Sequence, residues 1–504
     1  MLTLSAVTAA AAPIDDAPPG LIRSSTTLAK VHALYERTRS RERPRTGTVI
    51  EEWRLLQDRL SGTFRVRRLG KDVRETTTLG PLTFEQGIRG GTYWQQNRNG
   101  LTYTFTGFHD QRDEISDRVW ETPESQRYVR LIGESVALNA YVVEINPPGG
   151  RHEWRFVDKT SGNVVRMERV LKHRRFVTTY DDYRIFDGIP EPSHVRTLDS
   201  YGNERDQTLL SRTLDLTPDP KDVDIPASRR TLVEFPPATS FGRLPVRIAN
   251  GLLVVRVTIG AHAYDFLLDS GAAGIVVDPS VVEDGKFDRF GTRVGATIGT
   301  FSESTSIVPQ IAVGTLRMHN VVVRVVTIPF VVDEHTRIAG LLGFDFFADT
   351  VLHVDLARGV ADAIAPGTFH PASDVVSLPL ALDDKTPDVR AKIGGAYGRI
   401  VVDTGANRSV FTTAFASRAE FGAEGAGNTR FRAMGGTATA EAVRLKEFEL
   451  AGLAQADPVV DVSGADFSVE DVDGTAGTDL LRPYELYFDY RANTLYVRRS
   501  RAAA

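Results

Sequence analysis

The chain has 504 residues, and at about 150 residues per domain this length predicts about three domains. Its 60 Lys and Arg against 65 Asp and Glu give a net charge of −5, which provides no basic field for a phosphate backbone, so nucleic acid is not an expected partner. The absence of cysteine excludes disulfides, thiolate nucleophiles and Cys-ligated metal centres. No apolar run approaches the roughly 18 residues that span a bilayer, so no transmembrane segment is expected.

Residues 1–23 are predicted to be a secretory signal or a disordered tail. Met1 to Ala12 form an apolar stretch that ends in four alanines, as small residues do near a signal cleavage site. The first basic residue is Arg23, so the positive start of a signal is missing. We expect a periplasmic or secreted protein. The alternative is an Ala-rich disordered terminus, which leaves a cytoplasmic location open.

Residues 24–216 are predicted to form one β-rich domain that opens with a helix. Leu28, Val31 and Leu34 lie on one face of that helix, which follows a cluster of Ser and Thr. From residue 46 to 216, short extended runs alternate with turns rich in Gly, Pro and Asn, which predicts an antiparallel meander. The four tryptophans of the chain all fall in this half, where packing is their expected role.

Residues 217–241 are predicted to be a linker. Five prolines crowd this stretch, and proline fixes the backbone and removes a hydrogen-bond donor from any strand ladder. Beyond it the composition becomes richer in Val, Ile and Gly.

The second half of the chain contains an internal repeat. Phe-Leu-Leu-Asp-Ser-Gly-Ala at 266–272 recurs as Ile-Val-Val-Asp-Thr-Gly-Ala at 400–406, at an offset of 134 residues. Further landmarks keep this offset: Gly340 and Gly474, Gly343 and Gly477, Leu352 and Leu486, and Asp355 and Asp489. A single Asp-Ser/Thr-Gly would be interpreted as a turn. Two copies with their landmarks in register predict the duplication of one β-rich unit of about 130 residues.

Each copy places an aspartate at the tip of a strand, followed by a glycine that lets another backbone approach. If the two tips meet across a pseudo-twofold axis, Asp269 and Asp403 lie together, and Ser270 and Thr404 can hydrogen-bond across the seam. Two carboxyls about 3 Å apart cannot both ionise, so the pair shares one proton. One carboxylate then serves as a base and the other as an acid. The predicted supporting residues of the two tips are Ser270, Gly271, Thr404 and Gly405.

The two motifs resemble the aspartic peptidases, in particular bacterial retropepsin-like relatives that carry two lobes in one chain. The resemblance rests on Asp-Ser-Gly-Ala at 269–272, Asp-Thr-Gly-Ala at 403–406 and Leu-Leu-Gly at 341–343, and it covers about residues 240 to 500. It implies a mainly β chain with two tandem β-barrel lobes of the acid-protease fold, residues 242–370 and 371–504. It further implies one active site between the lobes, no metal or cofactor, and a monomer that forms an intramolecular pseudo-dimer.

The same resemblance implies flaps that close over an extended peptide. Candidate flaps are the Gly-bearing stretches 295–299 and 433–436. No tyrosine occurs between Tyr264 and Tyr397, which favours the retroviral type over the pepsin type. The second copy has a weaker Thr-Ala-Gly in place of Leu-Leu-Gly. It also has Arg408 five residues after Asp403, which we expect to face solvent, because an inward guanidinium would lower the pKa of the aspartates.

The first domain resembles periplasmic lipoprotein-carrier domains in its opening helix, its meander and the runs 154–166 and 180–184. This resemblance implies a curved half-barrel that can hold a lipid or lipoprotein. The alternative is a β-rich accessory domain that only docks on the protease.

The predicted function is that of an aspartic endopeptidase, in which Asp269 and Asp403 activate a water that attacks a peptide or protein substrate. The ten histidines form no HExxH motif, and the chain has no Gly-x-Ser-x-Gly or Walker motif, so zinc, serine-nucleophile and nucleotide chemistry are not expected. The alternative is a non-catalytic periplasmic protein that binds lipid, lipoprotein or peptide on a duplicated acid-protease scaffold.

Overall fold

The structure, a computed structural model, describes residues 17–39, 47–171, 174–334, 336–465 and 471–501. Most of the predicted signal or tail, residues 1–16, lies outside this range. The chain forms two compact units. The first comprises Met1–Thr46, Glu51–Gln57 and Phe108–Arg212, and the second comprises Gly47–Ile50, Asp58–Gly107 and Thr213–Ala504. No helix in the described ranges is both long and apolar enough to cross a membrane.

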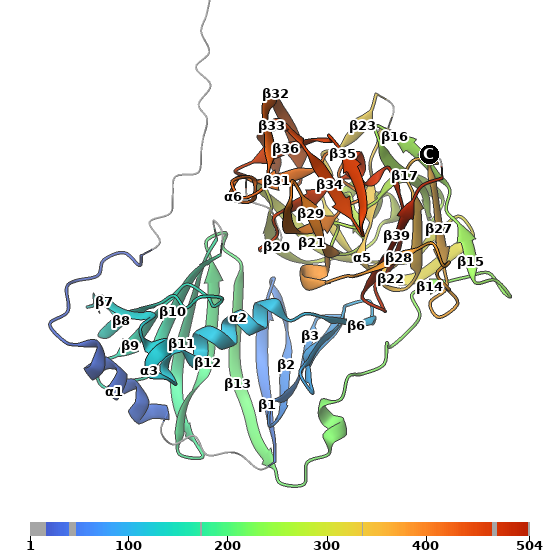
Figure 1. Cartoon of the computed structure of the whole chain (residues 1–504). Coiled ribbons are helices and arrows are strands. Elements are labelled where there is room, and N and C mark those ends of the chain that lie inside the picture. Colours follow the sequence, from blue (N-terminus) through green and yellow to red (C-terminus); the bar gives the residue numbers. More distant parts are fainter. Residues whose placement is uncertain (1–16, 40–46, 172–173, 335, 466–470, 502–504) are drawn as a thin grey trace, which may run out of the picture. The chain divides into compact units, whose positions relative to one another are not determined.

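The first unit is an antiparallel meander with two helices, residues 28–39 and 108–117, packed on it (Figure 1). Its strands follow the order β1-β13-β12-β11-β10-β9-β8-β7, as the alternation of strands and turns predicts. The elements are α1 Leu28–Arg39, β1 Thr48–Gln57, α2 Phe108–Asp117, η1 Arg118–Trp120, α3 Pro123–Gln126, β7 Val129–Ser135, β8 Ala140–Ile145, β9 Glu153–Asp158, β10 Val164–Leu171, β11 Arg174–Phe186, β12 Ile189–Asp199 and β13 Glu204–Asp215.

The predicted helical face of α1 buries Val31, Leu34 and Tyr35 against Val143 of β8 and Val157 of β9. Removing this apolar surface from water holds the helix on the sheet. The helix predicted at the start of the domain is therefore confirmed.

Helix α2 is held on the sheet of the first unit by ion pairs. Arg151 pairs with Asp113 (2.8 Å), and Arg155 pairs with Asp117 (2.7 Å) and with Glu153 (2.5 Å). Both arginine side chains are almost fully buried, whereas the side chains of Asp113 and Asp117 are 45% and 64% exposed, so water screens the helix side of these pairs. This helix contact is thus ionic, whereas that of α1 is apolar.

The second unit begins with five antiparallel strands in the order β6-β5-β4-β3-β2, and we call residues 58–107 the hairpin segment. The strands are β2 Leu60–Leu69, β3 Asp72–Leu79, β4 Leu82–Arg89, β5 Thr92–Gln96 and β6 Thr102–Phe105. Although the sequence predicts one domain over 24–216, this segment shares a compact unit with the repeated half of the chain.

The predicted linker stretch packs onto its surroundings in the second unit. It holds η2 Pro220–Val223 and β14 Val233–Glu234, and β15 Phe241–Arg243 follows at its end. Leu232 and Val233 are buried, and their backbone N–H groups both donate to the carboxylate of Asp349 (2.5 and 2.8 Å). The predicted boundaries at 217 and 241 stay predictions.

Each copy of the repeat folds into one β lobe (Figure 1). Lobe 1 contains β16 Val246–Ala249, β17 Leu252–Ile259, β18 His262–Leu268, β19 Val276–Val277, α4 Pro279–Gly285, β20 Arg289–Ala296, β21 Thr300–Val313, β22 Leu316–Val326, β23 Val331–Asp333, β24 Thr336–Arg337, β25 Gly340–Leu342, α5 Phe344–Ala348, β26 Val351–Asp355 and β27 Val360–Ile364. Lobe 2 contains β28 Val376–Pro379, η3 Asp383–Lys385, β29 Asp388–Ile393, β30 Ala396–Val402, β31 Val410–Thr412, α6 Thr413–Ala416, β32 Phe421–Ala433, β33 Gly436–Leu445, β34 Glu447–Leu450, β35 Leu453–Ala456, β36 Val459–Ser463, β37 Gly474–Ala476, α7 Thr478–Leu481, β38 Tyr484–Asp489 and β39 Thr494–Arg499.

The two lobes share their topology. In lobe 1, β25 lies between β18, to which it is parallel, and β19, to which it is antiparallel. In lobe 2, β37 lies in the same way between β30 and β31. The paired positions also keep the offset, since Leu268 pairs with Leu342 and Val402 pairs with Ala476. The duplication predicted from the sequence is therefore present in three dimensions.

A six-stranded sheet joins the lobes in the order β15-β27-β26-β38-β39-β28. Its central pair is antiparallel, with His353 of β26 opposite Tyr487 of β38. These two residues are themselves 134 apart, so the pseudo-twofold axis passes between them. Their rings stack with centroids 4.6 Å apart.

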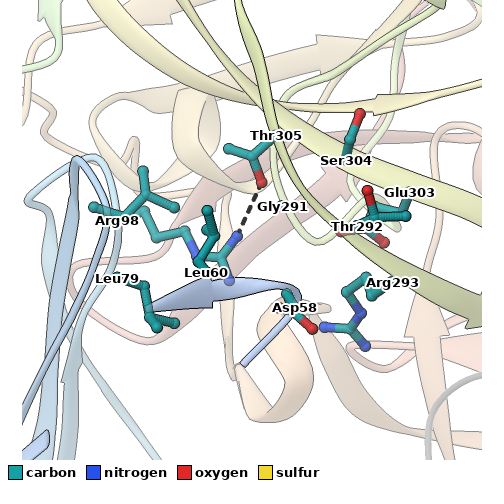
Figure 2. Close-up of a pocket in the computed structure, with 11 residues that line it drawn as sticks. Asp58, Leu60, Leu79, Arg98, Gly291, Thr292, Arg293, Glu303, Ser304 and Thr305 are labelled. Carbon is teal, nitrogen blue, oxygen red and sulfur yellow. Dashed lines mark hydrogen bonds between the residues drawn. The ribbon is translucent and has the colours of Figure 1, made fainter. Parts of the chain in front are cut away.

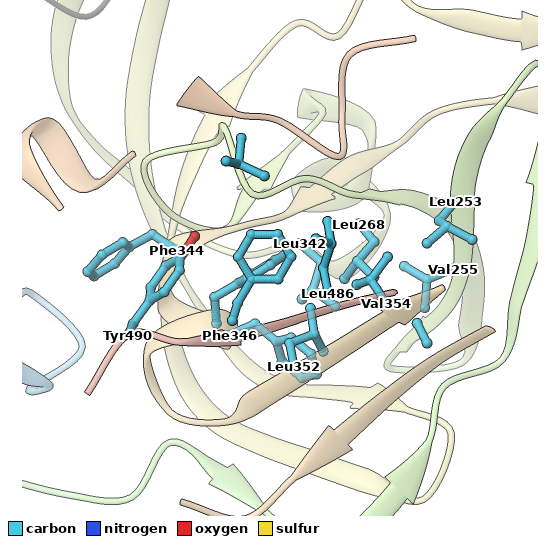
Figure 3. Close-up of a cluster of buried hydrophobic side chains, with 14 of the residues drawn as sticks. Leu253, Val255, Leu268, Leu342, Phe344, Phe346, Leu352, Val354, Leu486 and Tyr490 are labelled. Carbon is cyan, nitrogen blue, oxygen red and sulfur yellow. The ribbon is translucent and has the colours of Figure 1, made fainter. Parts of the chain in front are cut away.

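The hydrophobic core of the second unit is continuous through both lobes. Leu268 and Leu342 from lobe 1 lie in it together with Leu486 and Tyr490 from the end of lobe 2 (Figure 3). Packing of this kind fixes the strands that lead to the two repeated aspartates.

Candidate active site

The two repeated aspartates occupy equivalent loops at the ends of buried strands. Asp269 follows β18, and its N–H donates to the carbonyl of Leu342 (3.1 Å). Asp403 follows β30, and its N–H donates to the carbonyl of Ala476 (2.9 Å). We call residues 269–272 and 403–406 the Asp loops.

A reciprocal set of hydrogen bonds ties the two Asp loops together. The N–H of Ser270 donates to Oγ1 of Thr404, and the N–H of Thr404 donates to Oγ of Ser270, both at 3.0 Å. The two hydroxyls donate onward across the seam, from Ser270 to the carbonyl of Val402 (2.6 Å) and from Thr404 to the carbonyl of Leu268 (2.7 Å). Both side chains are fully buried, and the N–H and hydroxyl groups of Ser270 and Thr404 each have a partner from the other lobe.

The glycine of each Asp loop lies against the carboxylate of the other lobe. A Cβ atom at Gly271 would stand 2.7 Å from Cγ of Asp403, and one at Gly405 would overlap the carboxylate of Asp269. The structure therefore brings together all six residues singled out from the repeat. Asp269 and Asp403 keep some exposure to solvent, so a water molecule can reach them.

The surroundings of the two carboxyls give them different proton affinities. Burial, the negative charge of Asp403 and a hydrogen bond between the carboxyls raise the pKa of Asp269 well above its usual 3.8. Burial also raises the pKa of Asp403, but the N–H of Gly405 (2.8 Å) and the hydrogen bond from Asp269 oppose that rise. The two carboxyls therefore act as a coupled pair that shares one proton.

Substitution of Thr404 by Ala is expected to lower the free energy of unfolding by about 1–3 kcal/mol, because it leaves the N–H of Ser270 and the carbonyl of Leu268 buried without partners. Denaturant unfolding of the full chain measures this loss. Thr404→Ser keeps the hydroxyl and should retain most of the stability. Equal losses in the two variants would contradict the hydrogen-bond explanation.

Two β-hairpins reach over the lobes and touch at their tips. The β20–β21 hairpin has its tip at 297–299, and the β32–β33 hairpin has its tip at 434–435. The hydroxyl of Thr297 donates to the carbonyl of Met434, and the backbone of Gly435 leaves no room for a side chain at Gly299. Both tips fall in the stretches that the sequence predicts as flaps.

The base of the first flap rests on the hairpin segment (Figure 2). The N–H of Thr292 in β20 donates to the carbonyl of Asp58 in the turn between β1 and β2 (2.8 Å), and Arg98 donates to the hydroxyl of Thr305 (3.4 Å). A small, partly open pocket lies between these contacts and is lined by Arg293 among others. The flap base thus has support from outside the two lobes.

An apolar wall of lobe 1 lies between its Asp loop and the flaps. Leu267, Ala272 and Leu341 belong to this buried cluster, and Phe301 of the first flap and Met434 of the second pack against it. This cluster therefore packs the two hairpins against lobe 1 beside its Asp loop.

A second pair of aspartates, which the sequence analysis did not single out, anchors the Asp loops. Asp345 accepts from the N–H of Ile275 (3.1 Å), and Asp479 accepts from the N–H of Ser409 (3.0 Å). Asp345 and Asp479 are 134 residues apart, so the repeat offset itself could have identified them.

The structure corrects the prediction that Arg408 faces solvent. Its guanidinium binds the buried carboxylate of Asp461 through two hydrogen bonds (2.9 and 2.5 Å). Its side chain remains 36% exposed. Because this partner neutralises its charge, Arg408 does not need to face water to stay compatible with a protonated aspartate pair. The Thr-Ala-Gly of lobe 2 still packs closely against its Asp loop, as Leu-Leu-Gly does in lobe 1. A Cβ at Gly477 would meet the carbonyl of Ala406 at 2.8 Å, and one at Gly343 would meet that of Ala272 at 2.5 Å.

Within the described residues, no group of three or more His, Cys, Asp or Glu side chains is arranged to hold a metal ion.

Comparison with known proteins agrees with this geometry. Residues 255–346 and 389–479 each match the model of a family described as aspartyl protease. Among solved structures, the chain is similar to an aspartic proteinase from Irpex lacteus, with 15% identity and a TM-score of 0.35, over 52% of this chain and 98% of that chain. None of the curated proteins compared matches the chain. The two family matches and the sheet topology confirm the predicted fold class: a mainly β chain with two tandem lobes similar to aspartyl proteases.

Proposed function

We propose that the chain is an aspartic endopeptidase whose catalytic residues are Asp269 and Asp403. The observation that carries the proposal is the reciprocal bonding of the two Asp loops, which holds two carboxyls of unequal proton affinity against each other. The family matches over both lobes support the same reaction class.

In the proposed mechanism, the Asp403 carboxylate accepts a proton from a water held between the two carboxyls, and that water attacks the scissile carbonyl carbon. Asp269 gives its proton to the carbonyl oxygen, and the pair later protonates the leaving amine. Ser270 and Thr404 hold the loops in position and do not react. No covalent intermediate forms between enzyme and substrate.

The substrate is an extended peptide or unfolded protein. The touching flap tips can close over such a chain and exclude water from the site. The half-buried side chains of Phe301 and Met434 on the two hairpins favour an apolar side chain in the substrate.

The test is cleavage of a peptide library by the wild type and by Asp403→Asn, between pH 3 and pH 7. General acid–base catalysis contributes about 10²- to 10⁴-fold, so we expect kcat to fall by at least this factor. Asp265→Asn, on the strand leading to Asp269 and ion-paired with surface arginines, is the matched control and should keep its activity.

A wild type that cleaves nothing in this range and ignores a statine-type transition-state mimic would contradict the proposal. It would favour the alternative, a non-catalytic peptide- or lipid-binding protein. A periplasmic or secreted location, and a lipid or lipoprotein ligand at the amino-terminal domain, stay predictions.

A further inference from the structure

The two anchoring aspartates obtain their hydrogen bonds from different sources. In lobe 2, Asp479 takes two bonds from Ser409, one from its hydroxyl (2.5 Å) and one from its N–H (3.0 Å). Ser409 lies six residues after Asp403 and is fully buried. Lobe 2 therefore anchors its Asp loop with its own residues.

Lobe 1 lacks this side-chain donor. The residue equivalent to Ser409 is Ile275, which offers Asp345 only its N–H (3.1 Å). The place of the missing hydroxyl is taken by Asn97, whose Nδ2 donates to Oδ1 of Asp345 (2.9 Å). Asn97 and Asp345 are both buried and lie 248 residues apart, so this donor comes from the hairpin segment and not from lobe 1.

A further hydrogen bond orients the side-chain amide of Asn97 toward Asp345. Its Oδ1 accepts from the N–H of Leu101 (3.1 Å), which orients Nδ2 toward Asp345. The turn closes further through the N–H of Asn97 and the carbonyl of Leu101 (3.0 Å). Tyr103, two residues on, packs its ring edge-on to Phe344, the neighbour of Asp345, with centroids 4.7 Å apart.

The segment that Asn97 contacts also fixes the Asp loop of lobe 1. Leu342 accepts from the N–H of Asp269, and the N–H of Phe344 donates to the carbonyl of Ala272 (2.9 Å). Asp345 follows directly and holds the N–H of Ile275. Residues 342–345 therefore hold the Asp loop of lobe 1 by hydrogen bonds at its start and at its end. Without Asn97, the buried carboxylate of Asp345 would lose one hydrogen bond and keep those from the N–H of Ile275 and the side chain of Asn99, a loss that displacement of the segment could relieve.

We propose that Asn97 is a positioning residue for the aspartate pair, supplying to Asp345 the hydrogen bond that Ser409 supplies in lobe 2, so that the hairpin segment completes the active site. This inference rests on the proposed peptidase function. The asymmetry between Ile275 and Ser409 makes the contribution of the hairpin segment specific to lobe 1.

The test compares two leucine variants of the full-length chain. Asn97→Leu removes the donor to Asp345. Gln96→Leu removes an equally buried amide from the same hairpin, one that bonds Thr102 and the carbonyl of Ala227 but not Asp345. We expect Asn97→Leu to lower kcat at least about tenfold with KM nearly unchanged, and to speed hydrogen exchange at the Ile275 N–H by about tenfold. Gln96→Leu should lower only the thermal stability.

A rescue variant tests whether a hydroxyl at position 275 can replace the amide of Asn97 as the donor to Asp345. Ile275→Thr places a hydroxyl at the position equivalent to Ser409, so the double variant Asn97→Leu/Ile275→Thr should recover most of the lost kcat. Equal effects of the two leucine variants on kcat, or an unchanged Ile275 exchange rate in Asn97→Leu, would overturn the proposal. So would a double variant no more active than Asn97→Leu when Ile275→Thr alone is active. If the wild type cleaves no peptide, the proposed function fails, and the exchange rate at Ile275 alone decides whether Asn97 anchors the loop.

Discussion

Gly405→Ala is expected to reduce kcat for peptide cleavage by at least about 100-fold, although the substitution adds a single methyl group. The new Cβ would overlap the carboxylate of Asp269, so the carboxyl must move away from Asp403. Because displacement of a catalytic group by about 1 Å can cost about 100-fold in rate, even a small movement is enough. Gly271→Ala should act in the same direction on Asp403, which its Cβ would approach to 2.7 Å.

A steady-state assay of the folded variants measures this effect. Gly464→Ala is the control, since a Cβ at this position of lobe 2 meets no atom of the described residues within 4 Å. It should keep the rate of the wild type. A Gly405→Ala enzyme with normal kcat would mean that the carboxyls do not need their present separation.

Asp269→Asn is expected to be more stable than the wild type at neutral pH. The pKa of Asp269 is higher in the folded protein than the usual 3.8, so the folded state binds this proton more tightly than the unfolded chain does. The free energy of unfolding of the wild type therefore falls as the pH rises from about 4 to the raised pKa, by about 1.4 kcal/mol for each pH unit in that window. Asparagine has no such proton to lose, so the free energy of unfolding of Asp269→Asn does not fall in this way as the pH rises.

Thermal unfolding between pH 4 and pH 8 checks this expectation. The advantage of Asp269→Asn should grow across the window, stay constant above the raised pKa and vanish at the acid end. Asp265→Asn, which removes a carboxylate paired with surface arginines, should show no such gain. A parallel course of the wild type and Asp269→Asn at all pH values would show that Asp269 ionises normally in the folded protein.

The sequence predicts the aspartate pair because its determinants are local and occur twice. Asp269 and Asp403 sit in short motifs whose strands, glycines and offset can be compared within the chain itself. The hairpin tips could be located because each Gly-bearing stretch lies between an Asp loop and the later glycines of its copy, although the two stretches do not keep the 134-residue offset. Arg408 could not be placed in this way, because its partner Asp461 lies 53 residues away and the pair has no copy in lobe 1.

The contact of the hairpin segment with lobe 1 could not be predicted from the sequence either. Asn97 belongs to no repeat, and its contact with Asp345 spans 248 residues. Prolines and turns between the two halves favour a separate amino-terminal domain, yet tertiary packing places residues 58–107 with the lobes. Contacts between residues far apart in the chain depend on burial and on the pairing of polar groups, and neither produces a periodic pattern in the sequence.

The sheet that joins the lobes has a consequence for biosynthesis. Its strands β38 and β39, residues 484–499, pair with β26 and with each other, and they follow Asp403 by some 80 residues. A ribosome releases the chain from its amino end, so the first aspartate emerges long before its counterpart and before the strands that clamp the halves together. The two aspartates therefore cannot meet until the second half of the chain has been made and has docked, so the peptidase activity that we propose can arise only after both lobes have been translated.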